Sequence, residues 1–225
     1  MTQREEFISR IAQKLGRPTP TSVEPVEVSF PLFRLNSQEE RVEEFLKMYE
    51  IMGGNGAKAR TTEEAVSVLK NWFGEKPDWL NNQSIVTWDE LPTMARACLE
   101  ELKWTAYTYS ELPSNPEERN PIMDKMELGI TGADYAIVQS GSLILKSSPK
   151  RGRAVSLIPT RHLTFVAAST ILDSLDQAME KLASSDVPAA IEIISGPSRT
   201  SDIEMDLSIG VHGPVEVYTI VMLDQ

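Results

Sequence analysis

Segment 195–214 concentrates polar groups that could hold a small anion. Arg199 offers a fixed fork of N–H donors that matches a carboxylate or a phosphate, and hydroxyl residues flank it. The segment follows an apolar run at 189–194, typical of a buried strand, and a short helical pattern at 203–207 comes next. Because the free N–H groups of a helix start carry partial positive charge, this order predicts an anion site. Its predicted members are Ser198, Arg199, Thr200, Ser201, Asp202, His212 and Gly213.

The same residues also fit a purely structural role. Ser201 and Glu204 have the spacing of a capping box, which satisfies helix N–H groups without any ligand. The Gly-Pro pairs at 196–197 and 213–214 would then be ordinary turns. Spacing alone leaves both interpretations open. The density of donors after a strand, where open α/β sheets bind their ligands, favours the anion site.

A second polar turn, Gln139-Ser140-Gly141-Ser142, lies between two apolar runs. Its hydroxyls could bond their own backbone, as in many turns. Alternatively, its N–H groups and its two hydroxyls could face the Arg199 loop and complete the anion site. We interpret His162, just before an apolar strand, as a structural histidine. The basic run at 150–153 is typical of a solvated loop, but Arg153 is also predicted to bind the ligand, as are Thr131 and Asp134.

The composition excludes several classes of function. The 225 residues include 22 Lys and Arg against 33 Asp and Glu, and the net charge of −11 disfavours nucleic acid and anionic membranes as partners. One cysteine, Cys98, and two histidines cannot build a usual zinc site, nor can they supply the four thiolates of an iron–sulfur cluster. We therefore expect no cofactor on this chain, and any redox centre on a partner.

The sequence shows no targeting or nucleotide-binding signal. Its first residues are charged and lack an apolar leader, and no window approaches the about 18 apolar residues of a membrane span. No Gly-x-Ser-x-Gly, Walker or Gly-x-Gly-x-x-Gly pattern occurs, so hydrolase, triphosphatase and dinucleotide interpretations have no support. We expect a cytoplasmic protein without a membrane span.

Helical and extended patterns alternate along the chain, which predicts an α/β fold with a mostly parallel sheet. The proline-rich stretch at 17–35 predicts an extended arm between a helix at 2–15 and the main domain, with domains at 1–36 and 37–225. Further helices are predicted at 37–52, 61–73, 92–102, 117–126 and 171–182, and strands at 57–60, 84–87, 104–109, 143–146, 156–159 with 162–166, 189–194 and 215–222.

Three stretches make the chain similar to a known family. GITGADYAIVQSGSL, GRAVSLIPTRHLTFV and ISGPSRTSDIEMDLSIGVHGPVEVYTIVMLD resemble the LUD (lactate-utilisation) domain family, and the resemblance covers nearly the whole chain. It implies a three-layer α/β/α fold like that of CoA transferases and ribose-phosphate isomerases. It also implies a role in oxidising L-lactate to pyruvate with two partner proteins that carry iron–sulfur clusters. The matching positions are Thr131, Asp134, Gln139, Ser140, Gly141, Ser142, Arg153, His162, 198–202 and 210–213.

One position departs from the family pattern. Many members have Glu-Thr-Gly-Thr where this chain has Gln139-Ser-Gly-Ser142. In related CoA transferases a glutamate is the covalent nucleophile, and an amide cannot take that part. We therefore expect the turn to position a ligand in a subunit without its own catalysis. The alternatives are a free-standing isomerase or transferase for a phosphorylated or CoA-linked acid, using Asp134 or Asp202, and an assembly module that uses the N-terminal helix.

Overall fold

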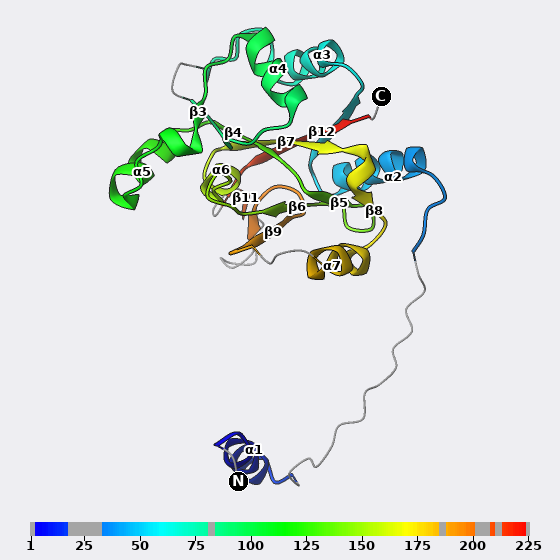
Figure 1. The fold of residues 1–225 in the computed structure, drawn as a ribbon, viewed down its shortest axis with the longest axis vertical. Helices are drawn as coiled ribbons and strands as arrows, with labels where there is room; N and C mark the ends of the chain where they lie inside the picture. Colours follow the sequence, from blue (N-terminus) through cyan, green and yellow to red (C-terminus); the bar gives the residue numbers. More distant parts are fainter. Residues whose placement is uncertain are drawn as a thin grey trace. The chain divides into compact units, whose positions relative to one another are not determined.

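The computed structural model describes residues 3–17, 33–80, 84–184, 188–200, 208–209 and 213–223. Contacts divide the chain into two units, Met1–Leu32 and Phe33–Gln225. The first unit holds helix α1, Gln3–Lys14, with an acidic first turn and a basic last turn, as the helix dipole favours (Figure 1). Among the described residues, no helix is both long enough and apolar enough to cross a membrane.

The second unit is built around a six-stranded sheet whose neighbouring strands are all parallel. Parallel sheets are buried on both faces, and strands at the middle of this one are buried along most of their length. The strands in order across the sheet are β1 (Asn55–Ala59), β12 (Glu216–Met222), β7 (Arg161–Ala167), β4 (Leu128–Gly132), β2 (Ile85–Thr87) and β3 (Tyr107–Thr108).

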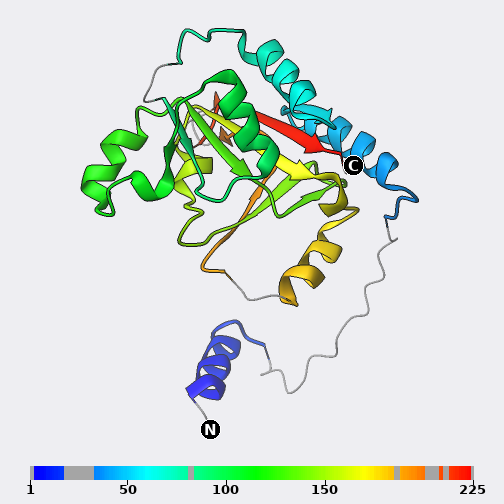
Figure 2. The ribbon, with the colours of Figure 1, turned by 45° about the horizontal axis from the view of Figure 1, so that its top comes forward.

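Helices cover both faces of this sheet (Figures 1 and 2). Gly129 and Gly132 point to opposite faces because they lie three residues apart on β4. A Cβ on Gly129 would lie 1.9 Å from the carbonyl oxygen of Val155, and one on Gly132 would lie 3.2 Å from the ring of Pro92. The Val155 face carries α2 (Gln38–Ile51) and α6 (Ala154–Leu157), and the Pro92 face carries α3 (Thr62–Phe73) and α4 (Thr93–Leu102).

A second, four-stranded sheet lies on the α2 and α6 side. Its outer face is covered by α7, whose Ala178 and Leu182 bury Ile137, Ile144 and Leu172. The strand order is β8 (Ile171–Leu172), β5 (Tyr135–Ile137), β6 (Ser142–Lys146) and β9 (Ile191–Ile194), and α7 spans Leu175–Ala183. The other elements are α5 (Pro116–Met123), the 3₁₀ turns η1 (Tyr109–Glu111) and η2 (Ala168–Thr170), and the pair β10 (Arg199–Thr200) and β11 (Ser208–Ile209).

The predicted α/β class with a mostly parallel sheet between helices is confirmed. The helix starts follow the predicted chemistry: the side chains of Ser37 and Thr61 accept hydrogen bonds from the backbone N–H groups of Glu40 and Glu64. Such caps satisfy N–H groups that have no partner within the helix. The local pattern therefore locates α2 and α3 without tertiary information.

Four local predictions are wrong. Residues 156–159 do not form a strand, because residues 154–157 coil into α6, where Ser156 bonds back to Arg153. The run 189–194 gives β9, an edge strand whose Ile191 and Ile193 are exposed, not a buried strand. Residues 171–172 pair in β8, so the last helix begins later, and β3 covers only part of 104–109.

Gly129 and Gly132 allow a close contact between the layers of the fold. Both lie in β4, a fully buried strand of the parallel sheet. Glycine is needed at 129 because the carbonyl of Val155 approaches the strand too closely for any side chain. The glycines therefore mark a tight contact between layers and not a bend of the chain.

Candidate functional site

The direction of the parallel strands gives the sheet two distinct edges. We call the end of the sheet where these strands begin the amino edge and the end where they finish the carboxyl edge. Both terms refer to the ends of the strands and not to the outermost strands of the sheet. The chain enters β12 from Val215, whose N–H donates to the carbonyl of Thr160 just before β7, so this entry lies at the amino edge. Ser198 donates its N–H to the carbonyl of Pro214 at the same place. The predicted Arg199 loop is therefore anchored at the amino edge.

Three hydroxyls form a chain of hydrogen bonds beside this loop. Ser140 Oγ lies 2.7 Å from Ser142 Oγ, which lies 2.6 Å from Ser195 Oγ. The antiparallel register of β6 and β9 brings Ser142 and Ser195 together. Leu143 pairs with Ile194, so Ser142, just before Leu143, lies opposite Ser195, just after Ile194. We call Ser140, Ser142, Ser195 and Arg199 the serine–arginine cluster.

The end of α2 supports both polar turns of this cluster. Gly141 has a φ of 58°, and a Cβ there would lie 2.8 Å from the backbone of Met48 and Tyr49. Gly196 has a φ of 83°, and a Cβ there would lie 2.2 Å from the carbonyl oxygen of Met52. Arg199 Nη2 donates to that same oxygen at 2.7 Å, where a cation at a helix C-terminus is favoured. The two turns predicted to converge do so, against a helix end.

Some predicted site residues lie elsewhere or are not described. Thr131 is fully buried and bonds His162 Nε2 at 2.8 Å inside the sheet, so it lines no surface. Arg199 and Thr200 form β10, paired with β11, and the predicted helix at 203–207 lies outside the described residues. Ser201, Asp202, Gly210 and His212 also lie outside them, as does the side chain of Thr200.

Burial keeps His162 neutral. Its ring is buried, with Thr131 and Thr164 within hydrogen-bonding distance, and desolvation lowers its pKa to about 3. A histidine with that pKa carries one ring N–H and no positive charge at neutral pH. The interpretation of His162 as a structural residue agrees with this geometry.

Arg153 lies near a carboxylate that sequence analysis missed. Burial raises the pKa of Glu192 on β9, while its Oε2 accepts a hydrogen bond of 2.7 Å from Ser156 and the positive charge of Arg153 opposes the rise. A Cβ on Gly213 would lie 3.2 Å from the Cβ of Ser198 and 3.7 Å from the carbonyl oxygen of Leu157. No pattern in the sequence marks Glu192, since it sits inside an apolar run.

Asp134 lies at the far end of the β5–β6 hairpin from the serine–arginine cluster. Ile137 pairs with Ser142 near the turn, whereas Asp134 Oδ2 accepts a hydrogen bond of 2.8 Å from the N–H of Lys146. Lys146 follows Ser142 by four positions along β6, which places the two ends about 13 Å apart. Among the described residues, the predicted site residues therefore divide into two groups, one at each end of this hairpin.

Asp134 instead lines a pocket of about 260 Å³ at the carboxyl edge. Arg151 Nη1 lies 3.2 Å from Asp134 Oδ1, and Arg151 Nε lies 3.3 Å from Glu90 Oε2. Sequence analysis missed Trp88, Glu90 and Arg151, because their proximity depends on the strand order. The lining residues are Trp88, Glu90, Leu91, Pro92, Gly132, Ala133, Asp134 and Arg151.

No metal centre is formed by the part of the chain that the structure describes. Its described residues hold no group of three or more His, Cys, Asp or Glu side chains that could bind an ion. Cys98 is buried on α4, and burial together with the nearby Glu101 raises its thiol pKa to about 12. This thiol is therefore protonated and unavailable as a ligand or nucleophile at neutral pH.

Comparisons with known proteins agree with this fold. The LUD domain family model matches residues 42–222. "Lactate utilization protein C 1" of Bacillus mycoides (strain KBAB4) is 30% identical over 236 residues, covering 99% of this chain and 97% of that protein. "Uncharacterized protein YkgG" of Escherichia coli (strain K12) is 31% identical over 241 residues and 100% of both chains. A crystal structure of a DUF162 family protein from Deinococcus radiodurans has a TM-score of 0.61 at 22% identity, covering 84% of this chain and 100% of that one. The chain belongs to the LUD-domain family.

Proposed function

We propose that this protein is a component of an L-lactate utilisation system that oxidises L-lactate to pyruvate together with two iron–sulfur proteins. The observation that carries the proposal is the similarity, over almost the full length, to proteins named lactate utilization protein C. The composition of the chain supports a division of labour. A single cysteine cannot hold an iron–sulfur cluster, so the electrons of lactate oxidation would pass to partner chains.

Within this system, the role of this chain is to bind a small anion. The serine–arginine cluster supports that role, because hydroxyls can turn their O–H groups toward a negative ligand. Ser195 and Arg199 are exposed there, while Ser142 is buried beneath them. Arg199 uses Nη2 for the carbonyl of Met52, and a guanidinium has five N–H donors in total. A carboxylate or phosphate can therefore approach its other edge.

A growth experiment tests the role in lactate utilisation. A strain that lacks this chain is grown on L-lactate and, as the matched control, on pyruvate as sole carbon source. We expect growth to fail on L-lactate alone and to return when the wild-type chain is supplied, because pyruvate enters after the proposed step. Equal growth of the deletion strain on both acids would contradict the proposal.

The same strain tests the partners. A tagged wild-type chain isolated from lactate-grown cells should bring down two proteins with the absorbance of iron–sulfur clusters. The tagged chain from pyruvate-grown cells serves as the comparison. Isolation of the chain alone under both conditions would contradict the proposed partner proteins. The role in lactate utilisation would then be decided by the growth experiment.

A further inference from the structure

A crevice opens at the carboxyl edge, between β2 and β4. The chain leaves β2 through Pro92 into α4 on one face of the sheet, and it leaves β4 through Asp134 into β5 on the other. Neighbouring strands whose connections diverge in this way form a topological switch point, where open α/β sheets bind ligands. The pocket of about 260 Å³ lies at this point and is lined by residues from both exits.

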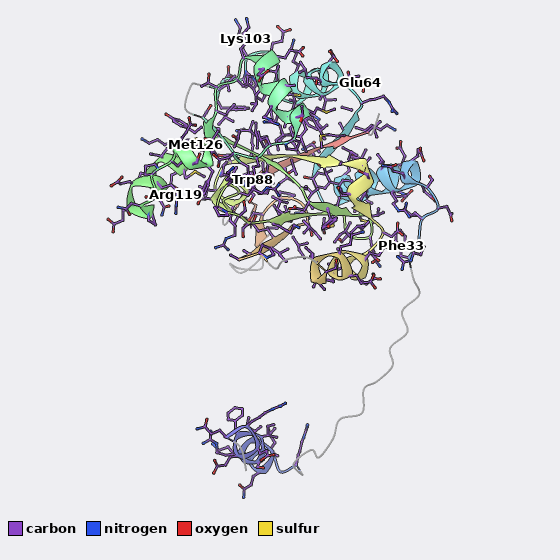
Figure 3. All side chains as sticks on the ribbon, viewed as in Figure 1. Phe33, Glu64, Trp88, Lys103, Arg119 and Met126 are labelled. Carbon is purple, nitrogen blue, oxygen red and sulfur yellow. The ribbon has the colours of Figure 1, made fainter. Side chains whose placement is uncertain are left out.

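Arg151 stands between two carboxylates at this pocket. Its guanidinium bridges Glu90 and Asp134 and lies 5.4 Å from the centroid of the Trp88 ring. Trp88, labelled in Figure 3, is buried in the domain. Its Nε1 donates a hydrogen bond of 3.1 Å to the carbonyl of Gly152. The ring and the backbone beside Arg151 are thereby fixed to each other. The guanidinium is held in place by the aromatic ring as well as by charge.

The two ion pairs of Arg151 differ in exposure. The side chain of Glu90 is 48% exposed, and an ion pair of that kind contributes only about 0–1 kcal/mol. The side chain of Asp134 is 15% exposed and is also fixed by the N–H of Lys146. A carboxylate from solution can therefore replace Glu90 on Arg151 at little cost, while Asp134 stays in place as an acceptor.

The charges around the pocket favour a monoanion. Glu90, Asp134 and Arg151 line the pocket, and Lys146 and Lys150 pair with these two carboxylates from outside the lining. The ion pairs at the pocket thus join two carboxylates to three cations, with one excess positive charge. The start of α4 adds partial positive charge beside Pro92. A ligand with a single carboxylate matches this balance better than a phosphate dianion or a cation does.

From this arrangement we propose that the pocket binds a small 2-hydroxycarboxylate, the chemical class of L-lactate. Arg151 receives the carboxylate in place of Glu90, and Asp134 accepts the hydrogen bond of the adjacent hydroxyl. The choice of lactate within this class rests on the proposed function, whereas the pocket and its charges do not. The site is distinct from the serine–arginine cluster, which lies at the other edge of the sheet.

Titration calorimetry with L-lactate tests this site on the full chain. Arg151→Gln should weaken binding by about tenfold or more, because a charge-assisted pair is lost. Glu90→Gln should strengthen binding by about threefold, because the competing carboxylate is gone. Propionate, which lacks the hydroxyl, should bind wild-type protein about tenfold more weakly than L-lactate, since it cannot donate the hydroxyl hydrogen bond to Asp134.

Matched variants exclude trivial explanations. Arg151→Lys keeps the charge but loses the fork, so its affinity should lie between those of wild type and Arg151→Gln. Lys70→Gln on the exposed side of α3 removes one positive charge elsewhere and should leave the affinity unchanged. Thermal unfolding of each variant shows whether it is folded, and Glu90→Gln carries the test if Arg151→Gln is not.

The possible results separate this inference from the proposed function. If wild type binds no L-lactate, or if Glu90→Gln and Arg151→Gln both leave its affinity unchanged, the pocket assignment is wrong, whatever the growth experiment shows. If the affinities change as expected but the deletion strain grows on L-lactate, the pocket is a hydroxycarboxylate site and the role in lactate utilisation is wrong. Loss of L-lactate binding in Arg199→Gln, with Arg151→Gln unaffected, would place lactate in the serine–arginine cluster instead.

Discussion

The two edges of the parallel sheet use polar residues in different ways. At the amino edge, the hydroxyls of Ser140, Ser142 and Ser195 bond one another, and Arg199 bonds the end of α2. At the carboxyl edge, the charges of Glu90 and Arg151 meet in a partly exposed pair beside a pocket. The comparison shows that a high density of polar residues does not by itself mean available donors. Part of the amino-edge set holds the fold together.

Replacing a glycine by alanine should change the free energy of unfolding far more at the amino edge than at the carboxyl edge. Gly141→Ala should lower the free energy of unfolding by about 3 kcal/mol, because its positive φ and the close backbone of α2 both oppose a side chain. Gly132→Ala, at the carboxyl edge, should cost only about 1 kcal/mol, since its Cβ would meet a proline ring at 3.2 Å. Urea denaturation measures both values. A larger loss of stability for Gly132→Ala than for Gly141→Ala would mean that the chain is packed more tightly at the carboxyl edge than at the amino edge.

Arg199 tests whether the amino edge binds ligand as well as supporting the fold. Arg199→Gln should weaken the binding of an anion there by about 2 kcal/mol, if the guanidinium makes a charge-assisted contact. Calorimetry with inorganic phosphate, pyruvate and L-lactate as probes measures the change, and Lys70→Gln again serves as the control. Unchanged affinity for every probe that binds would restrict Arg199 to its contact with Met52.

The sequence predicts local structure better than it predicts the site. Helix starts such as those at Ser37 and Thr61 depend on side chains within four residues, so their chemistry is visible in the sequence. Ser142 and Ser195 are 53 positions apart, and their convergence needs the pairing of β6 with β9. Sequence analysis offered this convergence as one of two interpretations of the Gln139 turn, and the local spacing of neither turn required it.

The carboxyl-edge pocket was missed for a related reason. Trp88 and Asp134 meet only because β2 lies next to β4, although β3 comes between them in the chain. Arg151 was interpreted as a solvated charge, since a basic run in a loop carries no sign of the ring beneath it. Asp134 was identified, but it was grouped with the wrong turn. Strand order, and not residue type, decides which charges become neighbours.

His162 tests how rigid the sheet is near the amino edge, with an effect that appears only as the pH becomes acidic. Its ring stays neutral in the fold, with a pKa of about 3, but takes up a proton near 6.5 when unfolded. Protonation therefore favours the unfolded state, and stability falls as the pH drops below 6.5, by at most about 1.4 kcal/mol per pH unit. His162→Gln keeps a polar group beside Thr131 but cannot titrate. Between pH 6.5 and pH 5, wild type should lose stability relative to this variant in urea denaturation. Parallel curves for the two proteins would mean that water reaches the ring, and the amino edge would then be the looser of the two edges.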